Sequence, residues 1–167
     1  MAEFSRYETY VLLNQDKPLW LSGIDLSGMD LRGANLRGAT LVHANLSNCN
    51  LQGIDLHEAN LGGANLENAI LVGSNLRAAS LRGANLRGAD MNEANLAEAD
   101  LFEADLTHAN LLHANLGGAD LTNTNLTNAN LFGTNAPDYR ILRAKSLEGA
   151  VMPDGSKNWR QEGHQES

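Results

Sequence analysis

Carboxylates are the most numerous reactive side chains in this chain of 167 residues, which has 20 Asp and Glu residues against 12 Lys and Arg residues. Paired carboxylates act as general acid and base when distinct environments in a pocket separate their pKa values. Asp occurs here at a position that Asn also fills, as in Ala84-Asn85-Leu86 and Ala104-Asp105-Leu106. What Asp and Asn share is an oxygen that can bond to turn backbone. The pattern therefore favours a structural role, and we expect no catalytic residues and no enzymatic activity.

The histidines and the Gly-rich segments also lack the neighbouring residues that a metal site or a phosphate site would need. His108 and His113 lie five residues apart, but a metal site needs further ligands and a second shell. The Gly-rich segments lack the strand, loop and helix order of a phosphate-binding loop. We therefore expect solvated histidines, no metal and no cofactor.

Cys49 is the single cysteine, so no intrachain disulfide is possible and the thiol is expected to be a small buried filler. The sequence contains no apolar run of about 18 residues and does not begin with a secretory pattern. We expect a cytoplasmic protein that does not enter a membrane.

The sequence repeats every five residues, and this repeat determines where these side chains lie. Leu recurs at every fifth position from Leu21 to Leu131, with Met91 as the one replacement. On a helix a five-residue step turns by roughly 140°, and on a continuous strand it alternates faces, so neither element would collect the leucines on one side. Within one unit, Ala and Leu are two residues apart and share a side if the backbone is extended. The period predicts a chain that coils around buried Leu and Ala, with Asn or Asp outward and two residues at each corner.

The phrase Ala-(Asn/Asp)-Leu-x-x, unbroken over residues 19–133, resembles the repeat of the pentapeptide-repeat family. The resemblance implies an all-β solenoid, a right-handed four-sided parallel β-helix with four units in each coil. It assigns residues 19–135 to a β-helix of about six coils.

The segments outside the repeat are expected to cap it. Residues 1–18 predict an N-terminal helical cap, with a helix over about 5–14. Residues 136–155 predict a C-terminal cap, formed by a short helix over about 137–145 and a final unit displaced by one residue. Ala136 and Ile141 keep the five-residue phase, so an irregular continuing coil is the alternative. Residues 156–167 are expected to be a flexible tail.

Two surface features are candidates for a binding site. The first is an acidic band, because residues 90–135 contain seven acids and no Lys or Arg. Its candidate residues are Asp90, Glu93, Glu98, Asp100, Glu103 and Asp105. The alternative is that Arg77 and Arg82, one coil earlier, form solvated ion pairs with Glu98 and Glu103.

The second feature is apolar. Leu112 and Phe132 are 20 residues apart and would stack on one outward side, with Phe102 outward nearby. Clustered outward apolar side chains suggest a contact surface. The alternative is that the C-terminal helix of the same chain covers them.

These features favour a non-enzymatic interaction scaffold that binds an unknown protein partner as a monomer or weak homodimer. Direct binding of nucleic acid is not expected from so acidic a chain. The resemblance supplies an alternative, since some family members imitate a B-DNA rod and bind or protect DNA gyrase. Those mimics are acidic and dimerise at the C-terminus, whereas this chain is acidic only in its last third and is expected to have a C-terminal cap.

Overall fold

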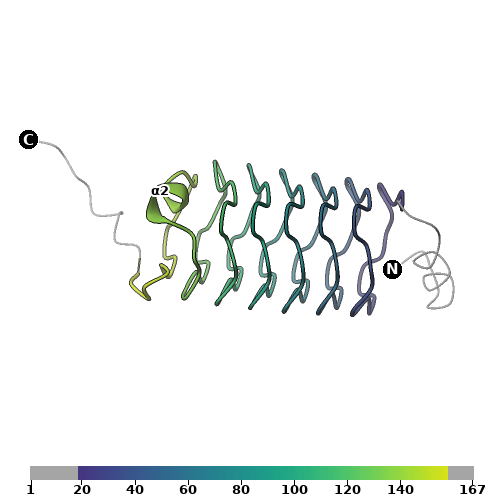
Figure 1. Ribbon diagram of the computed structural model, residues 1–167, viewed down its shortest axis with the longest axis horizontal. Coiled ribbons are helices and arrows are strands. Elements are labelled where there is room, and N and C mark those ends of the chain that lie inside the picture. The colour runs from purple at the N-terminus through teal and green to yellow at the C-terminus, as the bar shows by residue number, and fades with distance from the viewer. Residues whose placement is uncertain (1–18, 158–167) are drawn as a thin grey trace, which may run out of the picture.

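The computed structural model describes residues 19–157, and its chain forms a stack of similar coils along one long axis (Figure 1). The predicted N-terminal helix and the residues after 157 lie outside this range. Each unit contributes one isolated parallel bridge at its Asn or Asp position, and the bridged residues are 20 apart, as in Asp25↔Asn45 and Asn65↔Asn85. One coil therefore contains four five-residue units.

Units that are 20 residues apart form a column, and we number the columns by their first leucines. Column 1 begins at Leu21, column 2 at Leu26, column 3 at Leu31 and column 4 at Leu36. Three backbone N–H groups of each unit donate to the neighbouring coils. The Leu76 N–H donates to the Asn95 carbonyl at 2.7 Å, the Ala78 N–H to the Ala97 carbonyl at 2.9 Å, and the Asn75 N–H to the Ile54 carbonyl at 2.9 Å. A fourth bond closes the turn inside the unit, from the Ala79 N–H to the Leu76 carbonyl at 3.1 Å.

The second corner residue of every unit from Gly23 to Gly133 has a positive φ, which any L-residue other than Gly adopts at some cost. Gly suits this corner because it lacks a Cβ. The corners that lack Gly are occupied by Asn, His, Glu and one Ala, as at Ala78 with φ 55°.

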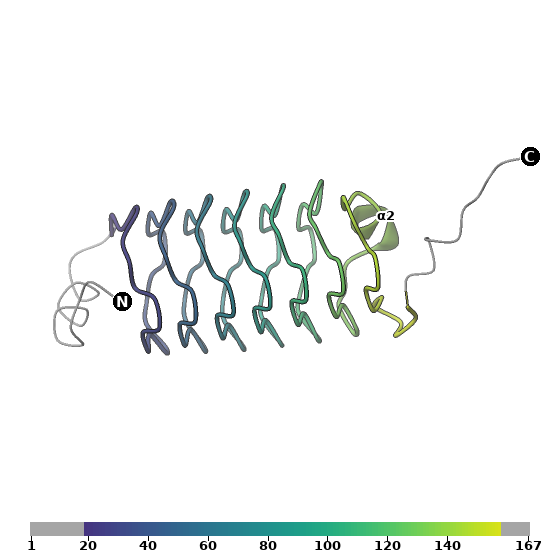
Figure 2. The ribbon, with the colours of Figure 1, turned by 180° about the vertical axis from the view of Figure 1, so that it is seen from behind.

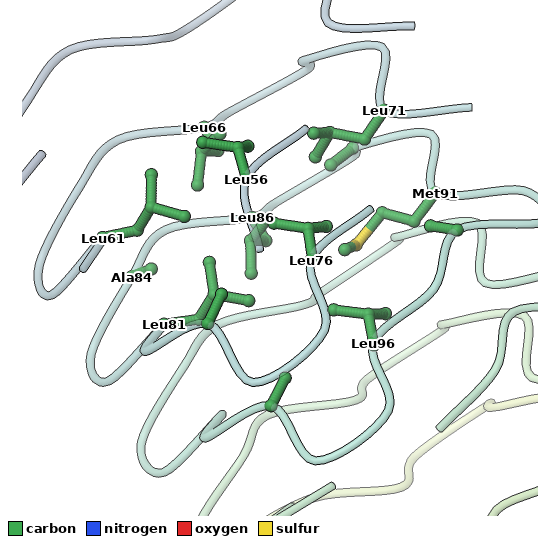
Figure 3. Packing of buried hydrophobic residues seen from close by; sticks show 14 of the residues in the cluster. Leu56, Leu61, Leu66, Leu71, Leu76, Leu81, Ala84, Leu86, Met91 and Leu96 are labelled. Carbon is green, nitrogen blue, oxygen red and sulfur yellow. The ribbon is translucent and has the colours of Figure 1, made fainter. Parts of the chain in front are cut away.

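Leu and Ala form the core, which confirms the predicted inward positions. The leucines between Leu36 and Leu106 have essentially no exposed surface, and Met91 is equally buried in its place. In Figure 3, Leu56, Leu76 and Leu96 of column 4 follow one another along the interior.

Small polar residues replace Ala at several inward positions, among them Cys49, Ser74 and Thr124. Cys49 and Thr124 are buried, and their side chains donate to the carbonyls of Leu26 and Leu101, each at 2.9 Å. The hydroxyl of Ser74 is equally buried but has no hydrogen-bond partner among the described residues. Ser74 therefore fills the small volume that Ala fills elsewhere, although its hydroxyl gains no hydrogen bond among the described residues.

At the C-terminal end the coil continues around a short helix, α2, which spans Asp138–Ile141 (Figures 1 and 2). The predicted helix over 137–145 was therefore too long. Ile141 is fully buried in phase with the leucines, so the alternative of a continuing coil also holds. After α2 the bridges Asn125↔Ser146 and Asn130↔Val151 join residues 21 apart, which shows that the turn accommodates one extra residue.

Arg140 explains how the helical turn is tolerated. Its own N–H bonds inside the turn to the Pro137 carbonyl, so it cannot donate to the coil below. Its guanidinium donates instead to the carbonyls of Gly118 and Ala119, at 3.2 and 3.0 Å. The side chain thus replaces a backbone donor that the repeat would otherwise have supplied.

Candidate functional site

The outward Asn and Asp side chains bind the turn that follows them. The Asp105 carboxylate accepts the Thr107 N–H at 3.0 Å, and the Asn75 amide oxygen accepts the Arg77 N–H at 3.3 Å. Asn can also donate to the preceding coil, as Asn85 Nδ2 does to Asn65 Oδ1 at 3.1 Å. Asp cannot donate to the preceding coil in this way, but it can accept from the Asn of the following coil, as Asp90 does from Asn110 Nδ2 at 2.9 Å.

Hydrogen bonds to Asp105 and Asp120 lower their pKa values, which keeps both carboxylates ionised and makes them weak bases. Burial tends to raise the pKa of Asp105, but the Thr107 hydroxyl and N–H and the Arg87 guanidinium outweigh it and hold that pKa below its ordinary value. The Thr122 hydroxyl and N–H lower the pKa of Asp120 as well. A general acid or base works best with a pKa near the operating pH, and these groups are shifted away from it.

An open hollow lies beside this acidic region and is lined by Glu103, Ala104, Asp105, Asn123, Asn125 and Lys145. Asp105 already accepts bonds from Thr107 and Arg87, so it is not free to bind a second group there without competition. Within residues 19–157 no group of three or more His, Cys, Asp and Glu residues is placed to hold a metal ion. Burial raises the pKa of the Cys49 thiol, which disfavours its reactive thiolate form.

The acidic band is partly neutralised by arginines that lie outside residues 90–135, as the alternative of ion pairs to the preceding coil allowed. Three of its acids pair with arginines of the preceding coil: Arg77 with Glu98 at 2.9 Å, Arg82 with Asp100 at 3.0 Å, and Arg87 with Asp105 at 3.1 Å. The predicted alternative of solvated ion pairs thus holds for Glu98, whereas Arg82 pairs with Asp100 and not with Glu103. In the described part of the chain, Asp90, Glu93 and Glu103 form no ion pair.

Phe102, the aromatic candidate beside this band, is only partly exposed. The Arg82 guanidinium carbon lies 4.3 Å from the centre of its ring, which is a cation–π distance. Arg82 therefore joins Asp100 and Phe102, and the ring has less free surface than its outward position suggests.

The other two candidates, Leu112 and Phe132, both lie in column 3. The His113 N–H donates to the Phe132 carbonyl at 2.9 Å, and Asn110 bridges to Asn130, so Leu112 and Phe132 lie one coil apart on the same outward side. Phe132 is 43% exposed and Leu112 is half-buried. We call the outward side chains of Ile70, Val72, Leu112 and Phe132 the apolar face.

Helix α2 does not cover the apolar face. The Arg140 bonds to Gly118 and Ala119 place α2 over the corner between columns 4 and 1. The segment that approaches Phe132 is the turn after Val151, because a Cβ on Gly155 would lie 3.2 Å from the Phe132 ring. The His113 ring also packs on Phe132, with the ring centres 5.8 Å apart, and Phe132 remains 43% exposed.

A family model described as pentapeptide repeats matches residues 21–58, 59–97 and 99–135, in 8 copies. The chain is a pentapeptide-repeat protein. The match covers the part of the sequence in which the five-residue phrase is unbroken. No curated protein matches the chain.

Solved pentapeptide-repeat structures resemble this protein. Rfr23 from the cyanobacterium Cyanothece 51142 is 33% identical with a TM-score of 0.50, over 63% of this chain and 85% of that chain. A pentapeptide-repeat protein from the Arabidopsis thaliana thylakoid lumen is 27% identical with a TM-score of 0.32, over 78% and 84%. QnrB1, a plasmid-mediated fluoroquinolone resistance protein, is 20% identical with a TM-score of 0.45, over 81% and 78%.

Sequence reasoning missed two residues of the apolar face, Ile70 and Val72. Ile70 is 43% exposed and occupies a position that Asn or Asp usually fills. Counting back from Leu112 in steps of 20 reaches Val72, so the coil period itself contained the signal. The described residues include no helix long and apolar enough to cross a membrane.

Proposed function

We propose that this pentapeptide-repeat protein is a non-enzymatic scaffold that binds a protein partner through the outward side of column 3. The observation that carries the proposal is the apolar face, in which Ile70 and Phe132 are each 43% exposed and Val72 and Leu112 are half-buried on the outside of a rod. The interior of the described coils is occupied by Leu and Ala side chains, whereas apolar side chains gathered outside are typical of a contact surface.

We further propose a right-handed, four-sided β-helix with helical caps at both ends, in which residues 1–18 protect the first coil. An uncovered coil end presents unpaired backbone groups that invite association. The buried, unreactive Cys49 is compatible with a cytoplasmic location.

Affinity capture from native lysate tests the scaffold, with the full chain as bait and heat-denatured bait as control. We expect at least one protein to be enriched by the folded bait alone, and enrichment of none would contradict the proposal. A DNA-supercoiling assay tests gyrase binding, the rival function. The pairing of Glu98, Asp100 and Asp105 with arginines weakens the resemblance to a polyanion. We therefore expect no inhibition of gyrase at micromolar protein, and inhibition would favour the rival.

A further inference from the structure

We propose that the apolar face docks an amphipathic helix of the partner, with apolar side chains along column 3 and a Lys or Arg beside Glu93. This inference rests on the proposed scaffold function and specifies the chemistry of its partner.

The outward side chains of column 3 differ from those of column 2. The first corner position of column 3 holds Arg32 and Gln52 in the first two coils, and then Val72, Asn92, Leu112 and Phe132. In the coils that hold the last four, the same position in column 2 is filled by Glu67, Arg87, Thr107 and Thr127. Since both columns share the same backbone and bury a Leu or Met, the repeat does not require apolar residues at this outward position.

The backbone of column 3 favours a helix over an added strand. Strand addition needs an exposed sheet edge with free N–H and carbonyl groups. Here the Leu111 N–H already donates to the Asn130 carbonyl at 2.8 Å, and the Asn110 N–H donates to the Ala89 carbonyl at 2.9 Å. A partner lying across this side can therefore use only side-chain contacts.

The spacing of the coils also suits a helix. Paired strands lie about 4.8 Å apart, so the three steps from Val72 to Phe132 span roughly 14 Å. A helix rises about 5.4 Å per turn, so three turns span roughly 16 Å and present one apolar side chain to each coil. Same-side residues of an extended partner strand are about 6.6 Å apart, which does not match the coil spacing of about 4.8 Å. Such a strand could therefore align only one or two of its side chains with the coils.

The charges of column 3 indicate which charged residue the partner helix carries beside its apolar side chains. The units of column 3 between residues 49 and 154 contain Asp90, Glu93 and Asp154 but no Lys or Arg. Asp90 is engaged by the Asn92 N–H and the Asn110 amide, whereas Glu93 is exposed and forms no ion pair within residues 19–157. A basic residue on the partner helix would meet Glu93 without competition from a Lys or Arg of the described column 3 units between residues 49 and 154.

A defined peptide tests the inference. The probe is a fluorescent, Ala-based helical peptide of about 18 residues with Leu along one stripe and Lys beside it, and fluorescence anisotropy measures its binding to the full chain. The control peptide has the same composition, with the Leu residues distributed around the helix. We expect saturable binding of the striped peptide alone. Equal binding of both peptides, or binding of neither, would overturn the proposal.

Matched variants locate the site. The double variant Leu112→Ser with Phe132→Ser should weaken binding at least tenfold, since apolar anchors dominate such contacts. Val42→Ser changes a half-buried residue at the same repeat position in column 1 and should alter binding less than twofold. Glu93→Gln should weaken binding, whereas Glu103→Gln, at an equally exposed corner of column 1, should not.

If Glu103→Gln weakened binding as much as Glu93→Gln, the attraction would be general electrostatics and the docking site would be refuted. Circular dichroism of each variant establishes that it remains folded. A lysate partner that ignored the column 3 variants would overturn both this inference and the proposed binding through column 3. A partner that was weakened by Leu112→Ser with Phe132→Ser but was not displaced by the striped peptide would overturn this inference alone and leave the proposed scaffold function intact.

Discussion

Leu76→Ala tests the packing on which the rod depends. Leu76 has no exposed surface and lies between Leu56 and Leu96, which are fully buried in the same column. Replacing a buried Leu by Ala costs about 2–5 kcal/mol, depending on how far the site can collapse. The coils on both sides of Leu76 are joined by backbone bonds of 2.7 to 2.9 Å, which hold them apart, so we expect the upper part of this range, about 3–5 kcal/mol.

Thermal unfolding followed by circular dichroism measures the effect, which for a chain of this size corresponds to a fall in Tm of roughly 6–20 °C. The matched control is Arg77→Ala, one residue later and outward. It removes an ion pair whose two side chains are 49% and 58% exposed, and so well-solvated a pair contributes little to stability. Leu76→Lys should be worse than Leu76→Ala, because it buries an unpaired charge. If Arg77→Ala lowered the Tm as much as Leu76→Ala, the packing argument would be refuted.

Three further predictions concern the core, the carboxylates and the first coil. Ser74→Ala removes a buried hydroxyl without a partner and should raise stability by about 1 kcal/mol in urea unfolding, whereas Thr124→Ala breaks the bond to the Leu101 carbonyl and should lower it. The folded-state pKa of Asp105 is depressed, so its stabilising contribution is present above the unfolded-state pKa of about 3.9 and is lost as the pH falls through the lower, folded-state value. Asp105→Asn should therefore reduce the loss of Tm between pH 5 and pH 2, and an unchanged pH profile would contradict the assignment. Removal of residues 1–18 should cause concentration-dependent association in light scattering, and a truncated chain that stays monomeric would refute the proposed cap.

The repeat predicted which side chains are buried, because an extended three-residue segment places Ala and Leu on one side and Asn on the other. The position of each corner followed from the same period. The number of units in a coil did not follow from the period, which is compatible with any closed polygon; the resemblance to the family supplied it, and the 20-residue bridges show it.

The ion pairs between neighbouring coils were less predictable from the sequence. Arg77 reaches an acid 21 residues later, whereas Arg82 and Arg87 reach acids 18 residues later. Acids at both offsets lie within reach of a long arginine side chain, so sequence spacing alone cannot choose between them. The length of α2 could not be predicted from the sequence either. The helix ends where Ile141 is buried and Arg140 bonds to the coil below, and both contacts depend on that neighbouring coil.

The dissociation rate of a protein captured from lysate tests the central claim most directly. Surface plasmon resonance would compare the wild-type chain with Leu112→Ser plus Phe132→Ser and with the Val42→Ser control. Loss of apolar anchors acts mainly on dissociation, so the double variant should dissociate at least tenfold faster while the salt dependence of association is unchanged. The control should match the wild type. A double variant that dissociated at the wild-type rate would show that the apolar face is not the binding surface.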